Sequence, residues 1–249
     1  MRYFFLRPLL AGLLMLPVAA LAGVGKVSTP AVTEGEFEIE YTTIRYGDDG
    51  GNKLNNAQAH VVELEYSFTG RFMLGLELAG ERESPQSFQG EAYGVEAQYE
   101  LTKQGDWWFA SAAKAEYAFP FHESDASEGE VKLLLQRRQG PTRWTANINL
   151  QREFGANRRH GMELSSALQG LYLWNKHINP GVEWFADYGA TNNLTLSNEE
   201  GHYLGPVITG ELFSFKGGEI EYVAGYYRGL TSASAEDAAR LQLSYEIRF

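Results

Sequence analysis

The sequence predicts an all-β protein, a closed, antiparallel, up-and-down transmembrane β-barrel of about twelve strands. Three observations lead to this prediction. Apolar and polar residues alternate with a period of two along most of the chain, short and long connections alternate between the predicted strands, and tryptophans gather beside the short connections. A period of two places every second side chain on the same face of a strand, so each strand has one apolar and one polar face.

The clearest strand is the C-terminal stretch 239–249. Its apolar and polar residues occupy alternate positions without a break: Leu241, Leu243, Tyr245, Ile247 and Phe249 alternate with Arg240, Gln242, Ser244, Glu246 and Arg248. Such a strand needs an apolar environment on one face and water on the other. An amphipathic edge strand of a secreted β-sandwich would show the same pattern, so this stretch alone leaves both folds open.

The N-terminus predicts export from the cytoplasm. Arg2 and Arg7 precede an apolar run, 9–21, and small residues follow at Ala20 and Ala22. This is the pattern of a secretory signal peptide, 1–22, with cleavage after Ala22. Its apolar run is too short for a comfortable transmembrane helix, and no later segment has the 18 or so consecutive apolar residues that a helix needs to span a membrane.

Charge and cysteine content narrow the possible partners. Without Arg2 and Arg7 the chain has 19 Lys and Arg against 32 Asp and Glu, a net charge near −13. This charge disfavours nucleic acid as a partner. The chain has no cysteine, so backbone pairing and packing must stabilise it without disulfides.

After a segment without clear period, 23–34, which we assign to a periplasmic lead-in, the barrel domain is expected to occupy 35–249. The predicted strands are 35–46, 57–68, 71–82, 92–102, 107–118, 130–138, 143–154, 162–174, 182–189, 202–213, 219–230 and 239–249. Strands of 9–12 residues can cross a bilayer at a tilt, and an even number joined by alternately tight and long connections is typical of bacterial barrels.

Aromatic residues predict two interfacial rings. Trp107, Trp108, Trp144, Trp174 and Trp184 all lie near the short connections. A second group lies near the long loops: Tyr46, Tyr93, Tyr117, Phe154, Tyr188 and Tyr203. Amphipathic rings favour the headgroup level of a membrane, so we expect one group at each interface.

The C-terminus resembles that of bacterial outer-membrane β-barrel proteins of porin-like or transporter-like type, whose last strand commonly ends in Phe. The resemblance implies that Tyr245, Ile247 and Phe249 form the signal that the barrel-assembly machinery reads, with periplasmic chaperones as further partners during biogenesis. It also implies residence in the bacterial outer membrane, among its lipids and lipopolysaccharide. In hydrocarbon an open sheet edge is prohibitive, so the first strand should pair with the last.

The charged face of each strand is expected to line the lumen. The predicted lumen-lining residues are Glu38, Glu40, Glu63, Glu65, Glu77, Glu96, Glu100, Lys114, Glu116, Lys132, Arg138, Glu183, Asp187, Glu211, Glu221, Arg240, Glu246 and Arg248. Strands 162–174 and 202–213 are ambiguous because both of their faces are mixed. An acidic lining attracts cations and repels anions, so an open pore would be cation-selective.

Motifs for catalysis or metal binding are absent from the sequence. The five histidines are scattered without zinc-ligand spacing, and no phosphate-binding loop or nucleophile-elbow motif occurs. We therefore expect no cofactor and no metal. His160 with Ser165 or Ser166 could resemble the rim site of an outer-membrane acyl hydrolase, and the basic run 158–160 could touch lipopolysaccharide phosphates.

Three functions follow from the sequence. The leading hypothesis is a passive, porin-like channel for small solutes with a cation-preferring lumen. The second is a structural or binding barrel with a plugged lumen, whose external loops engage lipopolysaccharide or a partner. The third is a rim acyl hydrolase. The sequence does not predict the solute or the oligomeric state.

Overall fold

The computed structural model describes residues 23–47, 56–82, 87–194 and 200–249, so the predicted signal peptide lies outside the described residues. Within these described ranges, twelve strands form one sheet. They are β1 (Glu36–Tyr46), β2 (Gln58–Thr69), β3 (Phe72–Arg82), β4 (Gln89–Thr102), β5 (Ala110–Pro120), β6 (Ser127–Gln139), β7 (Thr142–Phe154), β8 (Glu163–Tyr172), β9 (Asn179–Ala190), β10 (His202–Phe215), β11 (Gly218–Gly229) and β12 (Asp237–Arg248). Among the described residues, no helix is long and apolar enough to cross a membrane.

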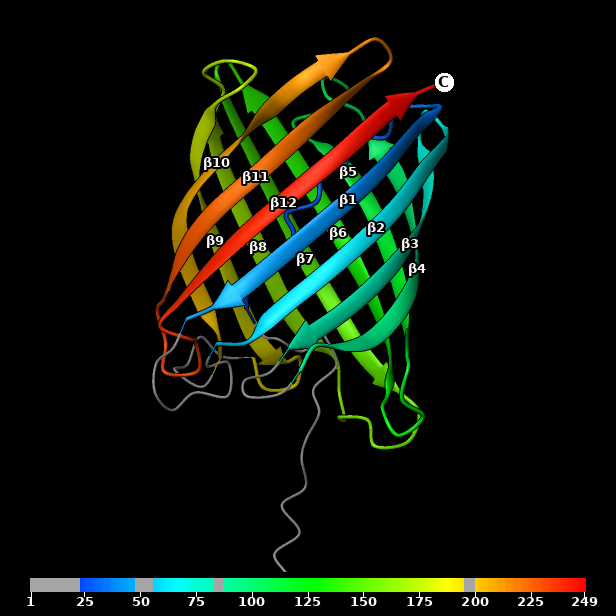
Figure 1. The fold of residues 1–249 in the computed structure, drawn as a ribbon, viewed down its shortest axis with the longest axis vertical. Coiled ribbons are helices and arrows are strands. Elements are labelled where there is room, and N and C mark those ends of the chain that lie inside the picture. Colours follow the sequence, from blue (N-terminus) through cyan, green and yellow to red (C-terminus); the bar gives the residue numbers. More distant parts are fainter. Residues whose placement is uncertain (1–22, 48–55, 83–86, 195–199) are drawn as a thin grey trace, which may run out of the picture.

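The sheet closes on itself, as the sequence predicted. Each strand pairs antiparallel with its neighbours in the chain, and β1 pairs with β12 from Glu36↔Arg248 to Tyr46↔Ala238. Figure 1 shows these two strands, blue and red, side by side in the wall of the barrel. Closure pairs the backbone N–H and C=O groups at the free edges of β1 and β12. In hydrocarbon, where no water is present, these groups would otherwise have no hydrogen-bond partner.

The two ends of the barrel differ in their connections. At one end, where β1 begins and β12 ends, the connections span 2 to 7 residues; at the other end they span 6 to 11 residues. We call these the short-turn end and the long-loop end; they lie at the top and the bottom of Figure 1. This confirms the predicted up-and-down arrangement, since hairpin connections join strands that are neighbours in the sheet.

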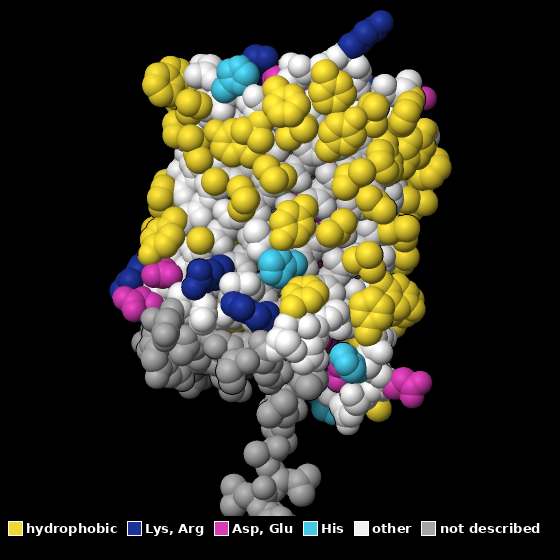
Figure 2. Space-filling view, in the orientation of Figure 1, with side chains coloured by type: hydrophobic (Ala, Val, Ile, Leu, Met, Phe, Trp, Pro, Cys, Tyr) yellow, Lys and Arg dark blue, Asp and Glu magenta, His cyan; other side chains and the backbone are white. Residues whose placement is uncertain are grey.

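The outer wall is apolar. Residues at alternate positions of β3, including Leu74, Leu76 and Leu78, are exposed, whereas Met73 and Ala79 on the opposite face are buried in the interior. Figure 2 shows hydrophobic side chains spread over the wall, with charged ones mostly near the two ends of the barrel. A continuous apolar surface of this extent is expected of a wall in contact with lipid.

The predicted aromatic rings are found only in part. Trp107, Trp108, Trp144 and Trp174 are exposed near the short-turn end, and Trp184 lies deeper on the outer wall, stacked on His202. The second ring contains an error. Tyr46 and Tyr203 are 0% exposed and lie inside the barrel, so they belong to the interior packing and not to an interface.

The segment 23–34 takes a course that the sequence did not predict. We expected a periplasmic lead-in, but its residues lie inside the barrel, where Val24 contacts Tyr46 near the long-loop end and Thr33 accepts a hydrogen bond from Glu36 at the other. In Figure 1 it is the dark blue trace within the ring of strands. We call residues 23–33 the N-terminal segment; they fill part of the space that a twelve-strand barrel leaves between its walls.

Candidate functional site

The candidate site is the interior of the barrel, where the N-terminal segment lies between two cavities. The cavity toward the long-loop end has a volume of about 400 Å³ and the cavity toward the short-turn end about 350 Å³. Lys26 borders both cavities. The layer of side chains around Lys26 is therefore the boundary between them.

Most of the predicted lumen residues border one of these cavities. Glu63, Glu77, Glu96, Glu116, Lys132 and Asp187 border the long-loop cavity. Glu38, Glu40, Glu65, Lys114, Glu221, Glu246 and Arg248 border the short-turn cavity. Five predicted lumen residues border neither cavity: Glu100, Arg138, Glu183, Glu211 and Arg240. Glu183 pairs with Arg240, and Glu211 pairs with Lys176. Glu100 Oε2 lies 3.8 Å from Lys103 Nζ, and Arg138 is exposed near the short-turn end.

Lys26 joins the N-terminal segment to the carboxylates of the wall. Its Nζ lies 2.6 Å from Glu63, 3.0 Å from Glu40 and 3.6 Å from Glu65. The ammonium group of Lys26 is thus shared by three carboxylates, and its charge compensates part of the acidic wall.

Two lysines of the wall continue this network. The Nζ of Lys114 lies 2.7 Å from Glu96 and 3.4 Å from Glu116. The Nζ of Lys132 lies 2.9 Å from both Glu116 and Glu130. Together these groups form what we call the lysine–carboxylate network: Lys26, Lys114, Lys132, Glu40, Glu63, Glu65, Glu96, Glu116 and Glu130. Removing one member of such a buried network leaves an uncompensated charge, which is strongly destabilising.

Hydrogen bonds hold the N-terminal segment at further points. The backbone of Ser28 donates to Asn147 Oδ1 at 2.8 Å, and Asn147 Nδ2 donates to the Ser28 carbonyl at 2.9 Å. Gln98 donates to the carbonyl of Thr29 at 3.1 Å, and Arg240 donates to the carbonyl of Gly25. These side chains satisfy backbone groups that have no strand partner, which is what allows an irregular segment to lie in the interior.

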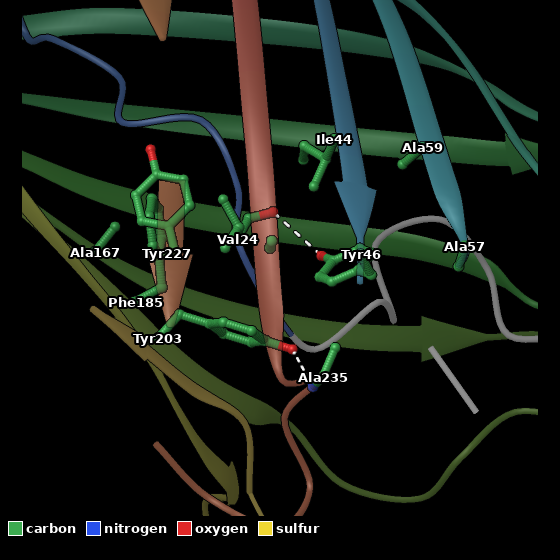
Figure 3. Close-up of a cluster of buried hydrophobic side chains, with 11 residues drawn as sticks. Val24, Ile44, Tyr46, Ala57, Ala59, Ala167, Phe185, Tyr203, Tyr227 and Ala235 are labelled. Carbon is green, nitrogen blue, oxygen red and sulfur yellow. Dashed lines mark hydrogen bonds between the residues drawn. The ribbon is translucent and has the colours of Figure 1, made fainter. Parts of the chain in front are cut away.

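The opposite side of the interior is apolar and aromatic. Phe185, Tyr203 and Tyr227 pack with Tyr46 and Val24, and Figure 3 shows these rings gathered around the N-terminal segment. We call this the aromatic cluster. Phe185 and Tyr227 meet edge to face with their ring centres 5.3 Å apart, a favoured arrangement for aromatic pairs.

One ion pair is embedded in the aromatic cluster. Arg240 donates to both carboxylate oxygens of Glu183, at 2.9 and 2.8 Å, and the hydroxyl of Tyr227 donates to the same carboxylate. The guanidinium also lies 5.5 and 5.7 Å from the ring centres of Phe185 and Tyr227. Both bonds to Glu183 come from Nη2, while Nη1 is the donor to Gly25. An ion pair flanked by aromatic faces suits arginine, whose flat charged group can stack and form hydrogen bonds at the same time.

Two strands contribute interior residues that the sequence missed. We assigned the charged face of each strand to the lumen, but Ala167, Leu171, Tyr203 and Val207 are buried apolar residues on the inner faces of β8 and β10. The same inner faces also carry polar residues such as Gln169 and Thr209. A mixed inner face gives no clear period of two, which is why the sequence left these two strands ambiguous.

The residues of the hydrolase hypothesis are not brought together. The hydroxyl groups of Ser166 and Tyr188 form a hydrogen bond of 2.8 Å, and Ser165 Oγ accepts a hydrogen bond from Asn149 Nδ2 at 3.2 Å. His160 is exposed and, among the described residues, bonds neither serine. In the basic run 158–160, Arg159 pairs with Glu153 and Glu163, so its charge is already compensated within the chain.

Two groups of carboxylates and histidine are close enough to share a cation. Glu63, Glu65 and Glu96 form one group, and Glu91, His122 and Asp125 form the other, near the long-loop end. In the first group, the ammonium groups of Lys26 and Lys114 already compensate the negative charge. The second group involves a single hairpin connection and its neighbouring strand, and acidic clusters of this kind are common on protein surfaces.

Comparisons with known proteins bear on the fold alone. No protein-family model and no curated protein matches the sequence. The structure is similar to the crystal structure of an outer-membrane channel from Pseudomonas putida F1, with a TM-score of 0.64 and 10% identity over 91% of this chain and 100% of the other. It is also similar to the KdgM porin in complex with disordered oligogalacturonate, with a TM-score of 0.50 and 11% identity over 86% of this chain and 99% of the other. The chain thus has the fold of bacterial outer-membrane β-barrels.

Proposed function

We propose that this protein is a passive channel of the bacterial outer membrane that passes small solutes and prefers cations. The observation that carries the proposal is the charge of the two cavities. Among the described residues, carboxylates outnumber basic groups nine to three around the long-loop cavity and seven to three around the short-turn cavity. Low-dielectric walls strengthen the field of this excess charge, which concentrates cations at both mouths and repels anions.

The structural neighbours support the channel role, because both are described as proteins of that kind, one an outer-membrane channel and the other a porin. In this proposal the short-turn end faces the periplasm and the long-loop end faces the exterior, as in bacterial barrels generally. Tyr245, Ile247 and Phe249 then end the strand that the assembly machinery reads. Phe249 suits this role because it is highly exposed at the end of β12.

Passage between the cavities depends on the layer around Lys26. We propose that solutes cross when the lysine–carboxylate network parts locally, beside the N-terminal segment. The long-loop cavity extends along this side of the interior, past Glu77, Glu116 and Glu130. Phe185, Tyr203 and Tyr227 pack together on the other side and border neither cavity. The acidic side of the lumen therefore offers the more open and the more charged path.

A second candidate function is a plugged barrel that binds lipopolysaccharide or a partner through its external loops. The observation that favours it is the hold on the N-terminal segment, which is anchored through Lys26, Ser28 and the carbonyls of Gly25 and Thr29. A segment held this firmly would keep the two cavities apart. Conductance distinguishes the two functions, since a permanently plugged barrel carries no current.

The test is the reversal potential of the purified protein in a planar bilayer under a gradient of KCl. We expect single-channel currents with a reversal potential of the sign that K⁺ selectivity gives. In the triple variant Glu77→Gln, Glu128→Gln and Glu130→Gln, which neutralises three carboxylates of the long-loop cavity, the reversal potential should move toward zero.

The matched control carries Asp106→Asn, Glu123→Gln and Glu236→Gln, three carboxylates that border neither cavity. It has the same change in net charge and should keep the selectivity of the unmodified protein. A reversal potential of the opposite sign would contradict the cation preference. Absence of any current from a barrel that is correctly folded would contradict the channel and favour the plugged barrel.

A further inference from the structure

We propose that the outer wall holds one glycerophospholipid in a groove near the short-turn end, with its phosphate on Arg137. The groove is a hollow of about 370 Å³ that crosses β6 to β10. It lies on the lipid-facing side, because its lining residues Trp144, Leu168 and Val182 are exposed while the intervening Thr145, Gln169 and Glu183 are buried.

The groove arises from small residues in a row of large ones. Arg137, Trp144, Gly170 and Val182 are successive partners across β6 to β9, and Leu135, Ala146, Leu168 and Trp184 form the next row toward the middle of the barrel. Gly170 and Ala146 lower the floor between the two tryptophans. A Cβ at Gly170 would lie 2.5 Å from the ring of Trp144, so glycine is what lets this ring lie flat across the wall.

The charge at one end of the groove indicates the occupant. Arg137 is exposed on the same face as Leu135, two residues before β6 ends at the tight connection. Among the described residues it forms no ion pair, unlike Arg159, Arg240 and Arg248. An arginine at the edge of a membrane, next to a tryptophan, is at the level of the lipid phosphates and is matched to them in charge and geometry.

The shape and charge together fit an acyl chain and a phosphate. The apolar groove takes the chain, and Arg137 takes the phosphate through paired hydrogen bonds. The choice of lipid rests on the proposed function, in which the short-turn end faces the periplasm. The periplasmic leaflet of the outer membrane contains glycerophospholipid, which selects this lipid over lipopolysaccharide.

The test is native mass spectrometry of the detergent-purified protein titrated with phosphatidylglycerol. We expect one tightly retained lipid per barrel. Arg137→Gln should weaken this retention about tenfold, the loss of one charge-assisted contact, whereas Arg137→Lys should restore part of it. Ala146→Leu, which fills the floor, should weaken retention to a similar extent.

Matched controls use the same wall away from the groove. Arg152→Gln removes an arginine on β7, at the other end of the strand that carries Trp144, and Ala97→Leu enlarges an alanine of the β4 wall. Both should retain the lipid as the unmodified protein does. Folding of each variant is checked by the shift in gel mobility on heating. If Arg137→Gln proves misfolded by this check, the lipid retention of Arg137→Lys, compared with the unmodified protein, decides the result.

Three results would overturn the inference. The first is equal lipid retention in Arg137→Gln, Ala146→Leu and the controls, and the second is retention of lipid A in preference to phosphatidylglycerol. The third is a dimer that Ala146→Leu dissociates, which would make a second copy of the chain the occupant of the groove. Failure of the lipid site leaves the conductance measurements unaffected. The two proposals can therefore fail separately.

Discussion

The two sides of the barrel interior are built on opposite chemistry. Along β1 to β6, the lysine–carboxylate network joins charges on neighbouring strands, with Lys114 at its centre. Along β8 to β12, the aromatic cluster packs Phe185, Tyr203 and Tyr227 around a single embedded ion pair. The N-terminal segment contacts both sides, through Lys26 on the first and Val24 on the second.

This lumen is filled in two ways. Paired charges keep water and ions nearby and can part locally, so the charged side suits a path for solutes. Close-packed rings exclude water and hold one geometry, so the aromatic side suits a fixed support for the segment. The two sides should also respond differently to substitution. A lost charge leaves its partners uncompensated, whereas a trimmed apolar group leaves a small cavity.

The largest effect is expected on the charged side. Lys114→Met removes the nearest cation from Glu96 and Glu65 and the second of two cations from Glu116, and breaking a buried pair typically costs about 3–5 kcal/mol. The free energy of unfolding in urea, measured with the protein in lipid vesicles, should fall by that amount. Lys103→Met is the control: this lysine has a side chain that is 48% exposed and should change stability by less than about 1 kcal/mol. Equal losses in the two variants would remove the distinction between the network and ordinary surface charge.

A smaller effect is expected where the two chemistries meet. Tyr227→Phe keeps the ring but removes the hydroxyl that donates to Glu183. Hydrogen bonds to charged groups contribute about 1.5–3 kcal/mol, so we expect a loss in that range in the same unfolding measurement. Tyr226→Phe removes a hydroxyl from the exposed neighbour, which donates to Asp237 at 2.9 Å, and should cost less. A larger loss of unfolding free energy in Tyr226→Phe than in Tyr227→Phe would mean that the hydroxyl of Tyr227 does not stabilise the embedded ion pair.

The smallest effect is expected within the apolar packing. Ile44 is a buried residue of β1 that packs with the aromatic cluster. Ile44→Val removes one methylene from this packing and should cost about 0.5–1.5 kcal/mol. Ile39→Val makes the same change on the outer face of the same strand, where lipid tails can fill the space, and should cost less. If the outer variant were the more destabilised of the two, the assignment of inner and outer faces on β1 would be wrong.

The strands could be predicted from the sequence because a membrane wall forces alternation on every strand. The last strand was expected at 239–249 and is found at Asp237–Arg248. The fifth was expected from Trp107 but begins at Ala110, since Trp107 and Trp108 lie in the connection. Their apolar character extended the pattern beyond the strand, as interfacial aromatics do when they lie beside a turn.

The interior could be predicted only where it is charged. Glu63, Glu96 and Lys114 stand out because a charge on a strand must avoid the lipid. Tyr46, Tyr203 and Phe185 do not, because an apolar ring suits either face. The position of the N-terminal segment left no local signal at all, since it depends on partners such as Asn147 that are more than a hundred residues away in sequence. Long-range contacts of an irregular segment cannot be recognised from periodicity.

The most direct test of this account is a cross-link between the N-terminal segment and the barrel wall. The chain has no cysteine, so Ser28→Cys with Asn147→Cys gives one defined pair. Oxidation, or a short bifunctional thiol reagent, applied to intact outer membranes should join the two residues in high yield, as measured by mass spectrometry of the digested protein. Ser28→Cys with Thr191→Cys, in the exposed long-loop region, is the control and should stay unlinked. A high yield for Ser28 with Asn147 would place the segment inside the lumen; a yield no greater than that of the control would show that the segment lies outside the barrel.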